Sequence, residues 1–204
     1  MNWNFENAAP VIGSITEGNA WDGEKMLYSN IAMNRILSYD PKTRNVAVWR
    51  DNTQGTNGLN FDAKGNLFGC AGNGRKIARF DLNGDMTTIV DRLDGRRINS
   101  PNDLAITPSG AIYFSDRVGD VEPNVGIDHS SIISAEPQEN GSYKAIRRTF
   151  DTTMPNGLLF SEDYKTLYVA QSDYRANEKR ELRAYPVKDD GSLETYEVLH
   201  DFGP

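Results

Sequence analysis

The sequence predicts an all-β protein that folds as a β-propeller of four-stranded blades. Short β-rich runs recur along the 204 residues, and turns rich in the chain's 18 Gly and 9 Pro residues separate them. No stretch offers a sustained helical period. The same order of four strands recurs four times, which is the sequence signature of propeller blades. A β-sandwich, the alternative, also has many short strands but does not predict this repeated order.

The clearest unit of the repeat is a hairpin in the middle of the chain. The runs Leu104–Ile106 and Ala111–Phe114 are rich in β-branched and aromatic residues, and they flank the turn Thr107–Gly110. Because Pro and Gly set such a turn, the pattern predicts a hairpin. This hairpin would bring Asp116, just after its second strand, back beside Asn102, just before its first.

The same hairpin, with two further strands behind it, recurs along the chain. We expect first strands at residues 20–21, 59–61, 104–106 and 158–160, and second strands at 26–28, 66–68, 111–114 and 166–169. We expect third strands at 35–39, 76–80, 131–134 and 181–185, and fourth strands that end at Asp51, Asp91, Asp151 and Asp201. Residues 1–204 are therefore expected to form one propeller domain.

Each repeat opens on a residue with a side-chain oxygen. These residues are Glu17, Asn57, Asn102 and Asn156, spaced by 40, 45 and 54 residues. The first strand of each blade lines the central channel of a propeller, so equivalent positions form one ring. One carboxylate and three carboxamides suit Ca²⁺, Mg²⁺ or Mn²⁺. A plain turn is the alternative for any single Asn-Gly pair, but four positions in register, one of them Glu, favour a site.

At these residues the sequence resembles the SMP-30/gluconolactonase family of six-bladed propellers, over essentially the whole chain. The motifs that carry the resemblance are Glu17-Gly18-x-x-Trp21, Asn34-Arg35-Ile36, Asn57-Gly58-Leu59, Ser100-Pro101-Asn102-Asp103, Phe114-Ser115-Asp116 and Pro155-Asn156-Gly157-Leu158.

The resemblance implies one divalent metal ion in the channel and hydrolysis of sugar lactones such as gluconolactone. Ca²⁺ is the first candidate, with Zn²⁺, Mn²⁺ and Mg²⁺ as alternatives. By motif, Glu17 and Asn156 match metal ligands, and Asn102 matches a residue that contacts the metal or the substrate. The polar residues expected to bind substrate at the mouth are Asn57, Asn102, Asp103, Asp116, Arg117 and Asp173.

The chain departs from the family pattern around the mouth of the channel. Asn19 stands where the family often has Pro, Asn30 where it has Asp, Arg117 where it has Pro, and Ala71-Gly72 where a Glu-His pair is common. These departures leave the fold intact and leave the exact substrate open.

The chain also supplies about four blades of the family's six. The family's remaining metal ligand is an Asp that opens the fifth blade. By the repeat arithmetic that position falls at about residue 206, just past Pro204. We therefore expect a C-terminally truncated propeller whose catalytic acid residue lies beyond Pro204.

Composition and motifs exclude several classes of function. A net charge of −7 repels phosphate backbones, so nucleic acid is not an expected partner. Residues 1–12 lack a signal peptide and no window is long enough to span a membrane, so a cytoplasmic protein without a membrane partner is expected. There is no Gly-x-Ser-x-Gly elbow and no zinc-type Cys/His spacing, and the single Cys70 is expected to be packed in the core.

Two classes of function remain. The first is a metal-dependent lactone hydrolase, in which water attacks a metal-polarised carbonyl. The second is a non-catalytic propeller, either a binding scaffold or an inactive remnant. The retained ring of oxygen ligands favours the hydrolase, whereas the short chain and the substitutions at the mouth favour the scaffold.

Overall fold

A computed structural model describes residues 6–8, 13, 15–81, 85–118, 126–175 and 179–203. These residues contain 18 β-strands and no helix. Sixteen of the strands form four antiparallel sheets of four strands each, and β9 (Arg92–Leu93) pairs with β10 (Arg96–Arg97) in a small fifth sheet. The prediction of an all-β protein with repeated four-stranded units is confirmed. Within the described residues no helix is long and apolar enough to cross a membrane.

Each four-stranded sheet is a continuous stretch of chain. The first sheet contains β1 (Thr16–Trp21), β2 (Met26–Asn30), β3 (Arg35–Asp40) and β4 (Asn45–Asp51), and the second contains β5 (Thr56–Phe61), β6 (Leu67–Ala71), β7 (Lys76–Phe80) and β8 (Met86–Val90). The third sheet contains β11 (Ser100–Ile106), β12 (Ile112–Arg117), β13 (Ser131–Pro137) and β14 (Tyr143–Arg147), and the fourth contains β15 (Pro155–Phe160), β16 (Thr166–Ser172), β17 (Arg180–Pro186) and β18 (Glu197–Asp201).

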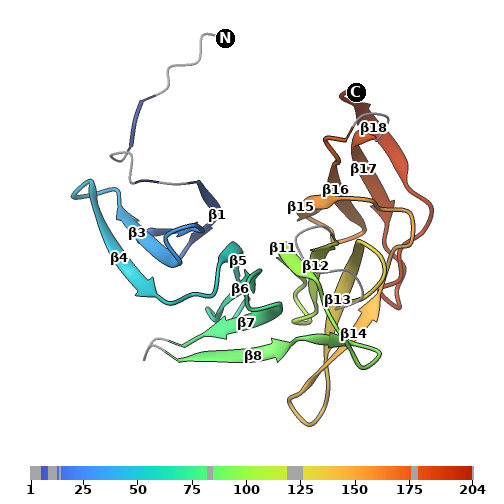
Figure 1. Cartoon of the computed structure of the whole chain (residues 1–204), viewed down its shortest axis with the longest axis horizontal. Helices are drawn as coiled ribbons and strands as arrows, with labels where there is room; N and C mark the ends of the chain where they lie inside the picture. The colour runs from blue at the N-terminus through green and yellow to red at the C-terminus, as the bar shows by residue number, and fades with distance from the viewer. Residues whose placement is uncertain are drawn as a thin grey trace.

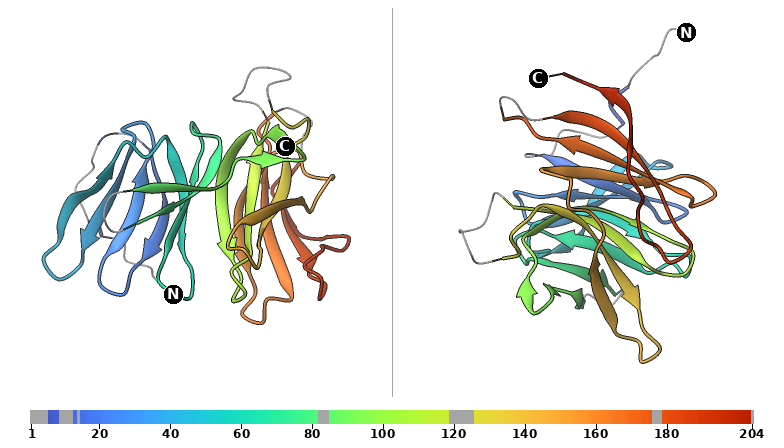
Figure 2. Two further views of the ribbon diagram at one scale, coloured as in Figure 1. Left: turned by 90° about the horizontal axis from the view of Figure 1, so that it is seen from below. Right: turned by 90° about the vertical axis from the view of Figure 1, so that its right-hand side faces the viewer.

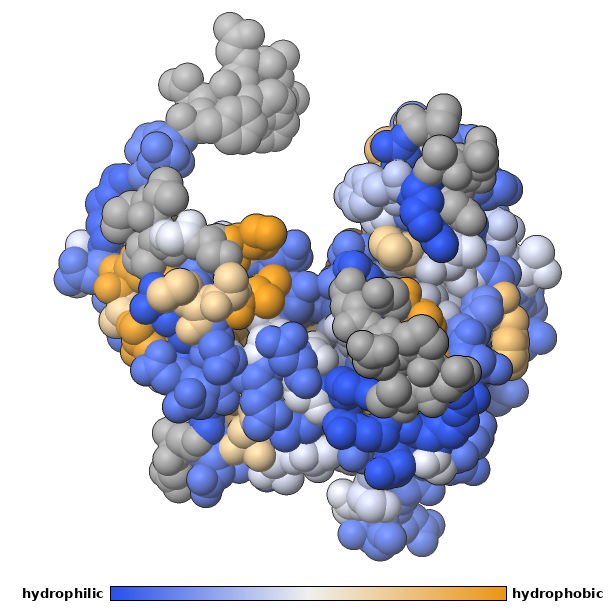
Figure 3. Space-filling model, viewed as in Figure 1, coloured by the Kyte–Doolittle hydropathy of each residue, from blue (hydrophilic) through white to orange (hydrophobic). Residues whose placement is uncertain are grey.

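The four sheets stand side by side in an arc (Figure 1). The first strand of each sheet, β1, β5, β11 and β15, lies on the concave side, and the fourth strand lies towards the periphery. A view turned by 90° about the horizontal axis shows the same succession of sheets along the arc (Figure 2, left). In the space-filling view the concave side is open between the first and fourth sheets (Figure 3). The inner strands are therefore the elements that any central site must use.

The predicted hairpin in the middle of the chain is formed by β11 and β12. Leu104 pairs with Phe114 and Ile106 pairs with Ile112. The turn closes with a hydrogen bond of 2.9 Å from Gly110 N to Thr107 O, and Gly110 has a φ of 89°. Glycine reaches this left-handed region without a steric penalty, which is why the turn signal in the sequence is reliable.

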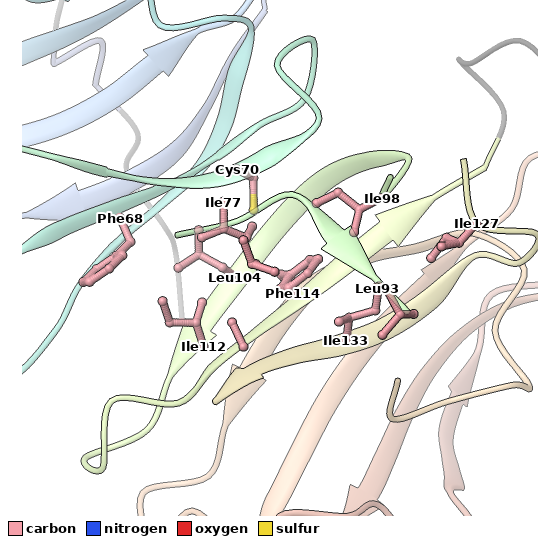
Figure 4. Packing of buried hydrophobic residues seen from close by; sticks show 12 residues of the cluster. Phe68, Cys70, Ile77, Leu93, Ile98, Leu104, Ile112, Phe114, Ile127 and Ile133 are labelled. Carbon is pink, nitrogen blue, oxygen red and sulfur yellow. The ribbon is translucent and has the colours of Figure 1, made fainter. Parts of the chain in front are cut away.

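The core consists of apolar layers between neighbouring sheets. Between the second and third sheets, Phe68, Cys70 and Ile77 face Leu104 and Phe114, and all five are buried (Figure 4). Equivalent layers lie between the first and second sheets and between the third and fourth. Burial raises the pKa of the Cys70 thiol well above its ordinary value, and the charges of two Asp side chains raise it further. Cys70 is therefore a packed core residue, as predicted.

The outer face of the fourth sheet is apolar and open. Leu159 is 66% exposed and Leu199 is 47% exposed. Together with Tyr168 and Leu182 they line a shallow groove of about 590 Å³. The corresponding face of the third sheet is covered by the fourth sheet. The total number of blades and the truncation remain predictions.

Candidate metal and substrate site

The four inner strands share one irregularity near their first residues. In each of them the pairing with the second strand skips two residues, which is the mark of a β-bulge. Glu17 pairs with Ser29 and directly precedes the bulge in β1. The bulges contain Gly18–Asn19, Asn57–Gly58, Asn102–Asp103 and Asn156–Gly157. The residues that the repeat singled out thus lie at or beside the bulge in all four inner strands.

Consecutive bulges touch one another. A Cβ atom on Gly18 would lie 2.1 Å from the carbonyl oxygen of Asn57. A Cβ atom on Gly58 would lie 2.7 Å from the Cα of Asp103. Only glycine permits backbones to approach this closely, and Gly18 also has a φ of 56°. The Gly in the Glu-Gly and Asn-Gly pairs therefore brings β1, β5 and β11 into contact on the concave side of the arc.

Asn102 carries a polar atom whose environment points to a ligand. Its Oδ1 is buried, and none of the residues that the structure describes donates a hydrogen bond to it. An unpartnered buried carbonyl costs about 1–3 kcal/mol, so such atoms in proteins call for a bound partner. Carboxamide and carboxylate oxygens are the ligands that hard divalent cations prefer. The side chains at the bulges, including the exposed Glu17, fit such a cation by their chemistry.

The acidic content of this region is low. Within the described part of the chain, no group of three or more His, Cys, Asp or Glu side chains comes together as a metal cluster. A cation at the bulges would therefore rely on the amide oxygens of Asn102 and Asn156 beside the carboxylate of Glu17. Ligand charge tunes the affinity of Ca²⁺ sites, so a donor set of this kind suits a weakly held ion.

Asp103 lies between two inner strands. Its Oδ1 accepts a hydrogen bond of 2.9 Å from Leu104 N, and its Oδ2 accepts one of 3.1 Å from Leu158 N. Burial raises the pKa of this carboxyl, and the negative charge of Glu17 raises it further, while the two hydrogen bonds act in the opposite direction. Both carboxylate oxygens of Asp103 thus accept hydrogen bonds from backbone N–H groups, one in β11 and one in β15. The contact of Asp103 with substrate remains a prediction.

Asp116 is placed differently from the rim position that the sequence suggested. It pairs with Pro101, so the backbone does return beside Asn102. Its side chain, however, is fully buried, and both carboxylate oxygens accept the Asn99 N–H at 3.0 and 2.9 Å. Burial raises the pKa of Asp116 to about 7 against the opposing effects of Asn99 and two arginines. The reason is that β12 lies between β11 and β13 and is covered on both faces, so that its first five residues, Asp116 among them, are all buried.

The two other predicted mouth residues lie at the ends of second strands. Arg117 is the last residue of β12, pairs with Ser100 and is partly exposed. Asp173 directly follows β16, and its buried carboxylate accepts a hydrogen bond of 2.9 Å from Arg175 Nε. Hydrogen bonds from Arg175 lower the pKa of Asp173 to about 2. The Asp173 carboxylate is therefore already paired with the guanidinium of Arg175, which belongs to the same loop. The substrate-binding roles of Arg117 and Asp173 stay predictions.

Two serines to which the sequence motifs gave no role, Ser29 and Ser115, hold the bulges from behind. Ser29 Oγ donates a hydrogen bond of 3.0 Å to the carbonyl of Glu17. Ser115 Oγ accepts one of 3.1 Å from Asp103 N. Both serines are fully buried, and both pair with an Ile on the third strand of their sheet. An alignment of the second strands with one another is the signal that would have found them.

The family model of the SMP-30/gluconolactonase/LRE-like region matches residues 15–204. A gluconolactonase from Zymomonas mobilis is 28% identical over 182 residues, which cover 78% of this chain and 49% of that protein. Among solved structures, a gluconolactonase from Xanthomonas campestris superimposes with a TM-score of 0.78 at 34% identity, covering 91% of this chain and 62% of that one. A regucalcin from Agrobacterium tumefaciens, described as a calcium-binding protein, gives a TM-score of 0.68 at 19% identity, covering 94% of this chain and 60% of that one.

The comparisons with sequences and with solved structures therefore both confirm the resemblance noted in the sequence. The chain spans about half the length of the curated relative that it matches and less than two thirds of the solved gluconolactonase. The similarity to regucalcin supports the fold. Because the family model matches nearly the whole chain, the chain belongs to the SMP-30/gluconolactonase/LRE-like family.

Proposed function

We propose that this chain acts in the hydrolysis of sugar lactones and that it uses one divalent cation, with Ca²⁺ as the first candidate. The observation that carries the proposal is the buried, unpartnered Oδ1 of Asn102 at the meeting point of the inner-strand bulges. The likeness to two gluconolactonases supports the substrate class. The same likeness favours the hydrolase over a non-catalytic scaffold.

The residues proposed to hold the cation are Glu17, Asn102 and Asn156. Glu17 supplies the negative charge, and the two carboxamides supply neutral oxygens from neighbouring inner strands. When bound, such a cation polarises a lactone carbonyl and lowers the pKa of water from about 15.7 towards 7. The protein's part is to present these oxygens on rigid strands rather than on flexible loops.

Other residues are proposed to orient the lactone and its hydroxyl groups. Asn57 lies in the bulge between those of β1 and β11, and its carboxamide both donates and accepts hydrogen bonds. Arg117, at the end of β12, is suited to an anionic group on a substrate. We assign no general base, because Asp116, whose pKa of about 7 would suit that task, receives the Asn99 N–H on both oxygens inside the protein.

The test combines cation binding with turnover. Wild type and Glu17→Gln are titrated calorimetrically with Ca²⁺, Mn²⁺ and Zn²⁺, and gluconolactone hydrolysis is followed with and without a chelator. Loss of the carboxylate should weaken binding of each ion that the wild type takes up by about tenfold or more, and hydrolysis should need the ion. Glu24→Gln, at an exposed turn beyond the other end of β1, is the matched control and should change neither quantity.

Unchanged affinity of Glu17→Gln for all three ions would remove Glu17 from the site. Lactone hydrolysis that is equally fast in the chelator would contradict the metal-dependent mechanism even if a cation binds.

A further inference from the structure

We propose that Asp103 is a positioning residue, which fixes β11 against β15 and thereby sets the separation of Asn102 and Asn156. This inference rests on the proposed function, because those two carboxamides are the proposed cation ligands. It assigns Asp103 a task distinct from substrate binding and from cation ligation.

The Asp103 carboxylate accepts hydrogen bonds from two neighbouring inner strands. Leu104 and Leu158 are the first paired residues after the bulges of β11 and β15, so they hold corresponding places in neighbouring sheets. Asp103 binds the backbone N–H of both, at 2.9 and 3.1 Å. Within the described part of the chain β15 is a sheet edge, so the Leu158 N–H meets no partner strand on that side, and Asp103 satisfies it instead.

The neighbouring bulges also bound the space around the Asp103 carboxylate. A Cβ atom on Gly58 would lie 2.5 Å from Asp103 Oδ1, and a Cβ atom on Gly157 would lie 3.7 Å from Oδ2. Glycine at position 58 is therefore required to leave room for the Asp103 side chain, whereas a Cβ atom at position 157 would make an ordinary van der Waals contact with it. From behind, Ser115 Oγ accepts the Asp103 N–H at 3.1 Å. The side chain is therefore held by contacts from its own sheet and from the sheets on both sides.

Only a short stretch of backbone separates Asp103 and Leu158 from the proposed ligands. Asn102 directly precedes Asp103, and Asn156 lies two residues before Leu158. A shift of Leu158 relative to Leu104 therefore moves one carboxamide relative to the other. Metal sites tolerate ligand distances within about 0.2 Å, so a small shift between the strands is enough to weaken the site.

The variant Asp103→Asn tests this role, because it keeps the size of the side chain and turns one acceptor oxygen into an NH₂ group. That NH₂ group faces a backbone N–H, so one of the two links is lost. We expect affinity for Ca²⁺ or Mn²⁺ to fall about tenfold, and we expect hydrogen exchange of the Leu158 amide to accelerate in an NMR measurement. Asp103→Gly, which places glycine in the third bulge as in the second and fourth, should have the same two effects.

The matched control is Asp62→Asn at the opposite end of β5. The Asp62 carboxylate also accepts two backbone N–H groups, from Lys64 at 2.9 Å and from Asn66 at 2.8 Å, but both lie within one turn. Asp62→Asn should lower thermal stability yet leave cation affinity within about twofold of wild type. A purely structural role of Asp103 would make the Asp103 and Asp62 variants behave alike.

The outcomes separate the two proposals. Wild-type protein that binds no divalent cation overturns the proposed function, and the positioning role falls with it. Wild-type binding with equal affinity in Asp103→Asn overturns the positioning role alone. Weaker binding with an unchanged Leu158 amide in Asp103→Gly, which loses both links, overturns it as well, because Asp103 would then act by touching the ion. If Asp103→Asn does not fold, Asp103→Gly decides by the same two measurements.

Discussion

At the scale of single residues, burial separates carboxylates that look alike in the sequence. Asp103 and Asp116 lie on the two strands of one hairpin. The Asp103 carboxylate links β11 to β15 through the Leu158 N–H, whereas the Asp116 carboxylate is buried and accepts the Asn99 N–H. Asp173 has a third environment, paired with Arg175 at the end of a strand. Their pKa values move in opposite directions because desolvation dominates the first two and hydrogen bonds from a guanidinium dominate the last.

The buried Asp116 predicts a particular dependence of stability on pH. Its pKa is about 7 in the folded protein and about 3.9 in an unfolded chain, so the folded state binds the proton more tightly. The stability that this group contributes is therefore complete below pH ~4 and is lost as the pH rises to ~7, by on the order of 2–4 kcal/mol. Urea unfolding of wild type and Asp116→Asn between pH 4 and 8 measures it. A stability difference between the two proteins that does not change with pH would contradict the assignment.

At the scale of elements, the sequence predicted the strands and hairpins but not the orientation of every side chain. The strands β11 and β12 could be located from the sequence because turn residues such as Gly110 and the β-rich runs beside them act through neighbouring residues of the chain. Orientation fails as a prediction because central strands of these sheets are covered on both faces. In β12 the first five residues are all buried, so no polar and apolar alternation marks where Asp116 points. The bond between Asp103 and Leu158 joins residues 55 positions apart and has no local signal.

The contact between inner strands predicts that glycine at the first bulge is required. Gly18→Ala would place a Cβ atom 2.1 Å from Asn57 O, whereas Gly65→Ala, also at positive φ, meets nothing within 4 Å. Gly65→Ala should cost about 1 kcal/mol for its backbone conformation alone. Gly18→Ala should cost several kcal/mol and should also weaken cation binding, because β1 is pushed away from β5. Thermal unfolding and calorimetry compare the two variants, and equal costs would show that the bulges do not touch.

At the scale of the whole molecule, the arc of sheets places β1, β5, β11 and β15 on its concave side, and these strands contain residues 17, 57, 102 and 156 from four distant stretches of the chain. The repeat spacing in the sequence anticipated this arrangement, because equivalent positions of repeated units share one side of the fold. The apolar outer face of the fourth sheet, with Leu159 66% exposed, matches the face that the third sheet buries against the fourth.

The most direct test of the cation site at the bulges is anomalous X-ray diffraction from crystals of this chain soaked in Mn²⁺. The account predicts one strong anomalous peak on the concave side of the arc, within ligand distance of the side-chain oxygens of Glu17, Asn102 and Asn156. Crystals of Glu17→Gln soaked in the same way should show a much weaker peak. A wild-type map with no peak there, or with its main peak at another group of residues, would contradict the central claim.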